Sequence, residues 1–99
     1  TTEIYTLSLH DALPIFTLPG PMTICDTIAN DCYRTRAQMA YAFASILNEE
    51  AKELEKIGVD VIQFDEPAFN SFTKETLEWG IDALEKAVEG LECTTAVHI

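Results

Sequence analysis

The stretch VDVIQFDEPAF, residues 59–69, decides the fold class of this chain. It opens with a run of strand-forming residues, and a mostly apolar run of this length is typical of a strand buried on both faces. Asp65 and Glu66 follow where the strand should end, and Pro67 helps to end it because proline lacks an N–H donor. Carboxylates at the carboxyl end of a buried parallel strand lie where α/β sheets and α/β barrels bind ligands.

The segment before this strand has the pattern of an amphipathic helix, predicted over residues 35–57. Thr35 and Gln38 have the spacing of a capping box, in which the hydroxyl and the amide satisfy free N–H groups at the first turn. Gly58 is a natural residue with which to end it. Its predicted apolar stripe consists of Met39, Phe43, Ile46, Leu47, Leu54 and Ile57.

A second helix is predicted over residues 74–89, with Gly90 at its end. Gly80 inside it should cost about 1 kcal/mol against alanine and would let the helix approach a neighbour closely. Its predicted apolar stripe consists of Leu77, Ile81, Leu84, Val88 and Leu91.

Two further strands flank these elements. One ends at the Pro-Gly-Pro turn of residues 19–21, after which a short helix is expected within residues 24–33, and the other covers residues 94–99. The order of strand, helix, strand, helix, strand predicts an α/β fold with a parallel sheet. We interpret it as about three parallel strands and two main helices of a (β/α)8 barrel of about 250 residues or more. A doubly wound sheet is the alternative.

Residues 1–15 match, residue by residue, one reading frame of a common short-read sequencing adapter. We therefore expect a non-native segment there, exclude it from fold reasoning together with His10 and Asp11, and expect the barrel fragment to occupy residues 16–99. A three-stranded slice with two open edges would expose much apolar surface, so we expect the isolated chain to be poorly stable.

The charge balance excludes several kinds of partner. Without residues 1–15, which hold Glu3 and Asp11 and no base, 15 acidic residues face 6 basic ones, a net charge of −9. Such a surface repels nucleic acid and anionic membranes, and no stretch reaches the roughly 20 apolar residues of a membrane span. The three cysteines, Cys25, Cys32 and Cys93, lack CxxC spacing, so we interpret them as small apolar residues in a cytoplasmic protein.

Candidate functional residues fall at the carboxyl end of each predicted strand: Gly20 and Pro21, then Asp65 and Glu66, then His98. Asp65 could hold an ammonium group, orient a ligand, act as a base, or cap backbone N–H groups of the next loop. For Glu66 the capping role is favoured. A lone strand histidine such as His98 is by itself more typical of a satisfied core residue than of a metal ligand.

Three segments together, LPGPMT (18–23), IQFDEPAF (62–69) and TTAVHI (94–99), resemble the C-terminal catalytic barrel of cobalamin-independent methionine synthase. The likeness is closest to the short, single-barrel homologues and covers essentially all of residues 16–99. QxDEPA is a fairly specific motif, whereas GPxT alone is weak. The resemblance implies an enzyme that transfers a methyl group to the thiol of homocysteine and forms methionine.

The resemblance also implies roles for two residues. Asp65 matches the family aspartate that binds the amino-acid substrate. His98 matches the first of the zinc ligands, and the remaining ligands and the general acid would lie beyond Ile99. Zinc would lower the pKa of the bound thiol so that a thiolate attacks the methyl donor. A single imidazole is not a zinc site, so this chain alone should bind zinc weakly or not at all and should be inactive.

Two positions depart from the long-form family pattern. Thr27 stands where those enzymes carry a folate-stacking tryptophan, and Ser71 stands where they carry a glutamate. The identity of the methyl donor therefore stays open. Two other hypotheses remain beside the homocysteine methyltransferase: a related thiol alkyltransferase, acting on coenzyme M or using a corrinoid methyl donor, and a barrel homologue without turnover.

Overall fold

The structure is a computed structural model that describes residues 15–30 and 32–99. Three parallel strands form one sheet in the order β1-β2-β3, with β2 in the middle, so the predicted parallel sheet is confirmed. The strands are β1 (Ile15–Pro19), β2 (Val61–Asp65) and β3 (Thr94–His98). The adapter-like segment lies outside the described residues except for Ile15, which pairs with Val61.

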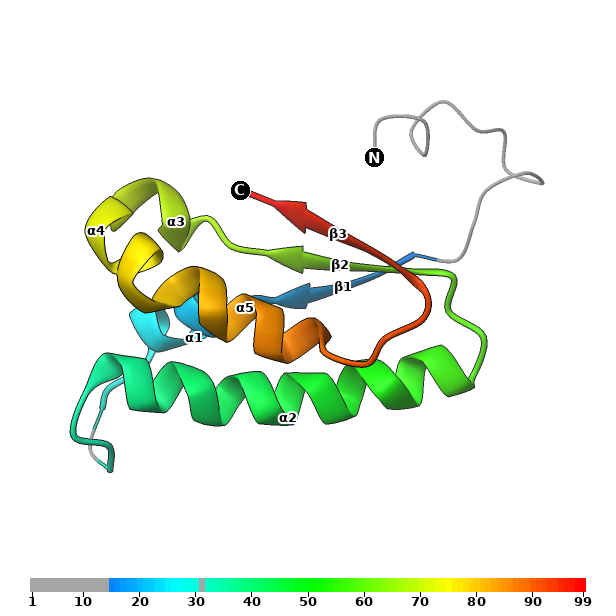
Figure 1. Cartoon of the computed structure of the whole chain (residues 1–99), viewed down its shortest axis with the longest axis horizontal. Coiled ribbons are helices and arrows are strands. Elements are labelled where there is room, and N and C mark those ends of the chain that lie inside the picture. The colour runs from blue at the N-terminus through cyan, green and yellow to red at the C-terminus, as the bar shows by residue number, and fades with distance from the viewer. Residues whose placement is uncertain (1–14, 31) are drawn as a thin grey trace.

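The connections between the strands are helical. The first contains α1 (Pro21–Thr27) and α2 (Arg36–Lys56), and the second contains α3 (Ala68–Ser71), α4 (Thr73–Glu75), a π-helical turn η2 (Thr76–Gly80) and α5 (Ile81–Val88). Figure 1 shows α2 and α5 side by side on the same side of the sheet, and they bury its core residues Leu18, Ile62 and Phe64. Helices on one sheet face agree with a barrel wall better than with a doubly wound sheet, which carries helices on both faces.

Helix α2 begins and ends as predicted, and Met39, Leu47 and Leu54 of the predicted stripe are buried, but the rest of the buried face differs from the prediction. The Thr35 hydroxyl accepts a hydrogen bond from the N–H of Gln38 over 3.1 Å, and the Gln38 amide oxygen accepts one from the N–H of Arg34. The prediction was wrong for Ile46 and Ile57, whose side chains are 58% and 77% exposed. The residues that α2 buries are Met39, Ala40, Ala44, Leu47, Ala51 and Leu54.

The alanines explain this difference. Ala40, Ala44 and Ala51 are fully buried, and so are Ala83 and Ala87 of α5, which packs against α2. Because the distance between packed helices depends on the side chains at the contact, small residues let these two helices approach closely. A stripe predicted only from large apolar residues leaves out a buried face that contains alanines.

The predicted helix over residues 74–89 is interrupted. The π-helical turn η2 precedes α5, and within it Thr76 and Gly80 are buried, whereas the predicted Leu77 and Ile81 are exposed. The rest of the predicted stripe is closer to the structure, because Leu84 is buried and Val88 and Leu91 pack against the core. A Cβ on Gly80 would lie 2.9 Å from Met22 Sδ, which confirms the close approach expected at this glycine.

Helix α1 begins earlier than the sequence pattern suggested. We expected a tight loop at residues 19–21 and a helix within residues 24–33, but α1 starts at Pro21, directly after the extended residue Gly20. Proline is favoured at the first helical position, since its fixed φ suits the helix and its missing N–H would have no helical partner there. The Pro-Gly-Pro sequence at residues 19–21 therefore marks the start of α1 rather than a tight loop.

The three cysteines, interpreted as small apolar residues, differ in their exposure. Cys25 is buried, Cys93 is half-buried and Cys32 is exposed. Burial raises the pKa of the Cys25 thiol, and it also raises the pKa of Cys93, which lies beside Glu55. Within the described part of the chain, no helix has the length and apolarity needed to cross a membrane.

Candidate active site

The three strand ends lie level at one edge of the sheet. Pro19, Asp65 and His98 occupy one row of the pairing register. Backbone hydrogen bonds continue the ladder past the strands, from the N–H of Gly20 to the carbonyl of Asp65 over 2.7 Å and from the N–H of Glu66 to the carbonyl of His98 over 2.8 Å. Figure 1 shows the strand arrowheads pointing towards the end of the molecule where α1, α3 and α4 gather. The predicted convergence of the candidate residues is confirmed.

Asp65 and His98 lie beside each other on the sheet face that α2 and α5 leave uncovered. Successive side chains of a strand point to opposite faces, so Gln63 and Asp65 point away from the core residue Phe64. Asp65 Oδ1 is 3.6 Å from His98 Nδ1, within ion-pair range but too long for a hydrogen bond. The side chains are 38% and 72% exposed, respectively, so both remain accessible from this face.

Asp65 is held by a residue that the sequence analysis did not single out. The Gln63 side-chain amide donates a hydrogen bond to Asp65 Oδ1 over 3.0 Å. Among the described residues, no hydrogen bond reaches the other carboxylate oxygen, and Asp65 caps no backbone N–H group. The capping alternative considered for Asp65 therefore finds no support in the described residues. The two-residue spacing on one strand was the signal that could have predicted the pair.

Glu66 takes the capping role instead. Its side chain is fully buried, and its carboxylate oxygens accept hydrogen bonds from the N–H groups of Met22 and Thr23, over 3.3 and 2.9 Å, in the first turn of α1. Burial raises the pKa of Glu66 above its ordinary value, while the hydrogen bonds from Thr23 and Met22 act against that rise. The structural role favoured for Glu66 thus fits its surroundings.

Gly20 is shaped to this carboxylate. A Cβ built on Gly20 would overlap Glu66 Cδ, Cγ and Oε1. Gly20 has an ordinary extended backbone, so the need for glycine here is steric rather than conformational. The end of β1, the start of α1 and the residue after β2 therefore form one interlocked unit directly beside Asp65.

A second contact joins the helices near the strand ends. The Arg36 guanidinium lies 3.7 Å from Asp26 Oδ1 and 3.5 Å from Glu75 Oε2, and its Cζ stands 4.9 Å from the ring centroid of Phe72. This contact links the end of α1 to the start of α2 and to α4. Sequence reasoning missed it because its members are scattered over three segments.

A side chain of α2 binds the backbone just before β3, the strand that ends at His98. Glu55 Oε2 accepts hydrogen bonds from the N–H groups of Glu92 and Cys93, each over 2.6 Å. The hydrogen bond from the Cys93 N–H is the main cause that lowers the pKa of Glu55. This contact helps to set the position of β3 beside β2.

The donor side chains at this edge of the sheet bear on the zinc site that the family resemblance implies. The described residues contain no cluster of three or more His, Cys, Asp or Glu side chains able to hold a metal ion. His98 is accessible and its Nδ1 faces a carboxylate, as expected of a histidine that ligates through its other nitrogen. It fits one ligand of a zinc site, and three more would have to come from elsewhere.

The two departures from the long-form pattern, Thr27 and Ser71, lie at the ends of α1 and α3. Thr27 is exposed at the end of α1, where its hydroxyl donates a hydrogen bond to the carbonyl of Ile24 over 2.9 Å. Ser71 is exposed in α3. Among the described residues, neither Thr27 nor Ser71 forms a hydrogen bond with Asp65 or His98.

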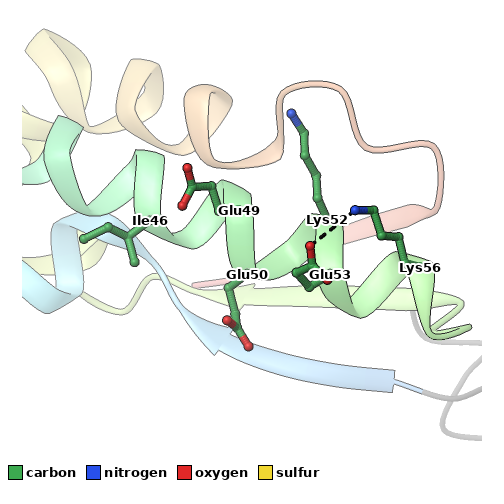
Figure 2. A pocket seen from close by; sticks show the side chains of 6 residues that line it. All are labelled: Ile46, Glu49, Glu50, Lys52, Glu53 and Lys56. Carbon is green, nitrogen blue, oxygen red and sulfur yellow. Dashed lines mark hydrogen bonds and ion pairs between the residues drawn. The ribbon is translucent and has the colours of Figure 1, made fainter.

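The surface hollow in Figure 2, about 530 Å³ in volume, lies away from these strand ends, along α2. It is open and mostly charged, and Lys56 Nζ lies 3.3 Å from Glu53 Oε1 within it. It has none of the candidate residues, and glutamates and lysines make up most of its lining. Its lining residues are Ile46, Glu49, Glu50, Lys52, Glu53 and Lys56.

Known proteins share both the sequence and the fold of this chain. The family model described as the catalytic domain of cobalamin-independent synthase matches residues 3–98. A methionine synthase of Sulfolobus acidocaldarius is 39% identical over 83 residues, which are 84% of this chain and 24% of that protein. A methionine synthase of Saccharolobus solfataricus is 37% identical over 93 residues, which are 94% of this chain and 27% of that protein.

A solved structure extends the comparison to three dimensions. It is a B12-independent methionine synthase from Shewanella sp. W3-18-1 in complex with selenomethionine, 60% identical, with a TM-score of 0.86 over 89% of this chain and 26% of that one. The fold is accordingly α/β and corresponds to part of a (β/α)8 barrel, as predicted. The chain spans about a quarter of the length of the relatives it matches.

Proposed function

Because this chain belongs to the cobalamin-independent synthase family, as part of its catalytic domain, we propose that it is a portion of a methyltransferase that forms methionine. In this proposal the intact barrel transfers a methyl group to the thiol of homocysteine. The chain supplies one wall of the site and the binding group for the substrate ammonium. The other zinc ligands and the general acid come from the remainder of the barrel.

The observation that carries the proposal is the pairing of Asp65 with His98. An amino-acid thiol presents an ammonium group at one end and a sulfur atom at the other. A carboxylate next to a potential metal ligand, on adjacent strand ends of an open sheet face, suits both groups of one small molecule. The Shewanella relative was solved with selenomethionine, the selenium analogue of the expected product.

Within this proposal His98 is one of four zinc ligands. When bound, zinc would lower the pKa of the substrate thiol and so favour the nucleophilic thiolate at neutral pH. Asp65 would hold the substrate ammonium and fix where the sulfur lies. Holding both ends of the substrate sets its geometry before the methyl donor arrives, which reduces the entropic part of the barrier.

Three further statements remain proposals alongside this function. The partners are small molecules, homocysteine and a methyl donor, and the acidic surface disfavours nucleic acid and membranes. We also propose a cytoplasmic location, and that residues 1–15 are a non-native segment before a barrel portion at residues 16–99.

The function can be tested in a full-length barrel. Residues 16–98 would replace the aligned segment of the Shewanella methionine synthase, and this protein is called the grafted enzyme below. We expect it to bind zinc and to form methionine from homocysteine, with methyl-folate and methylcobalamin tested as donors. A folded grafted enzyme that binds zinc but forms no methionine would contradict the proposal, and methylation of coenzyme M instead would favour the related alkyltransferase.

Replacing His98 by alanine in the grafted enzyme should remove bound zinc and reduce methionine formation by at least about a hundredfold, since losing a ligand lowers both metal affinity and activity. Zinc is measured by elemental analysis after dialysis, and methionine by chromatography. Thr95→Ala on the same strand is the control, because Thr95 is exposed and lies away from the row of Asp65 and His98. Retention of full zinc by the His98→Ala protein would refute the ligand assignment.

A further inference from the structure

Gln63 is the second polar side chain on the open face of β2. It lies two residues before Asp65, so both side chains project from the same face. Its amide nitrogen is 3.0 Å from Asp65 Oδ1, and both residues are half-buried. The function proposed above assigns Gln63 no task.

The hydrogen bond acts on the orientation of the carboxylate. The terminal torsion of an aspartate side chain is broad and roughly two-fold, so a free carboxylate can present either oxygen over a wide range of angles. The Gln63 amide holds Oδ1, the same oxygen that faces His98 Nδ1. Oδ2 receives no hydrogen bond from the described residues and so is the oxygen left for a ligand.

The chemistry of the donor matters as much as its position. An amide is neutral, so it orients the carboxylate without neutralising its charge, whereas a lysine or arginine in that place would compete with a cationic ligand. The neighbours of Gln63 in the register are Thr17 and Ala96, both small. Among the described residues, Asp65 is the recorded hydrogen-bond partner of the Gln63 side chain.

We propose that Gln63 is a positioning residue for substrate recognition, which holds Asp65 so that Oδ2 faces the ammonium group of the amino-acid thiol. This inference rests on the proposed function, because it needs Asp65 to bind that ammonium group. It predicts a loss of substrate affinity rather than a loss of metal or of fold when the amide is removed.

The test uses Gln63→Met in the grafted enzyme, which keeps a side chain of similar length but has no N–H donor. We expect the KM for homocysteine to rise about tenfold, the loss typical of a hydrogen bond to a charged group, with kcat changed less than about twofold. Thr17→Ala, in the same row of the sheet, should leave KM unchanged.

Zinc content and the thermal unfolding midpoint are measured for every variant. An unchanged KM in Gln63→Met, or a fall in zinc content and stability that parallels the rise in KM, would overturn the positioning role. Asp65→Ala separates the two proposals. If Asp65→Ala leaves the KM for homocysteine unchanged, the substrate-binding function assigned to Asp65 is wrong. If Asp65→Ala raises this KM and Gln63→Met does not, only the inference about Gln63 is wrong.

Discussion

Asp65→Ala in the grafted enzyme is expected to raise the KM for homocysteine by about 30-fold or more, while bound zinc stays near one ion per protein. Removing one partner of a desolvated charge pair costs about 2–5 kcal/mol, and the lower end applies here because Asp65 is 38% exposed. The ammonium group of the substrate would lose its counter-charge, whereas the zinc ligands would keep theirs. Steady-state kinetics and elemental analysis measure the two effects separately.

Asp65→Asn is the matched control for charge. The amide keeps the size of the side chain and an oxygen that can accept from Gln63, but it carries no negative charge. Its KM should therefore fall between those of the unsubstituted grafted enzyme and Asp65→Ala. If the Asp65 variants lose zinc more readily than they lose homocysteine binding, the assignment of Asp65 to the substrate ammonium group is wrong. Asp65 would then support the metal more than the substrate.

Gly20→Ala is expected to lower the free energy of unfolding of the grafted enzyme by about 3 kcal/mol, near the upper end of the cost of overpacking a closely packed site. The added Cβ would overlap the buried Glu66 carboxylate, which cannot move without leaving the N–H groups of Met22 and Thr23. Urea titration compares the variants. Gly80→Ala is the milder control, since its Cβ would meet the flexible end of Met22.

The double variant Gly20→Ala, Glu66→Ala identifies the cause. Glu66→Ala alone should also destabilise, by about 1–3 kcal/mol, because it leaves the N–H groups of Met22 and Thr23 without their acceptors. It also vacates the space that the new Cβ would occupy, so the combined loss should be smaller than the sum of the single losses by about 1 kcal/mol or more. Additive losses would show that Gly20 is required for another reason.

Much of this architecture follows from local patterns. An apolar run before two acids predicts β2 and its end, and a capping pair with Gly58 predicts α2 to within one residue at each end. The order of elements then requires parallel strands, which places Asp65 and His98 at one edge. These steps succeed because hydrophobic periodicity, caps and chain connectivity act over short distances along the chain.

Packing against other elements decided the rest. The face that α2 buries includes alanines that share core clusters with the alanines of α5, and Thr76 and Gly80 are buried in a π-helical turn that no apolar spacing predicts. The joint contact of Arg36 with Asp26, Glu75 and Phe72 depends on how α1, α2 and α4 meet in the folded chain. Such contacts depend on the shapes of surfaces that meet only after folding.

Asp65 and Glu66 show most clearly what the sequence determines and what only the tertiary structure decides. Their residue types and their place at a strand end are readable from the stretch at residues 59–69, but their separate tasks are not. Alternation along β2 leaves Asp65 on the open face beside His98, while Glu66, one residue on, turns inward to α1. A buried carboxylate needs hydrogen-bond donors, and those donors, Met22 and Thr23, lie 44 and 43 residues away in the chain.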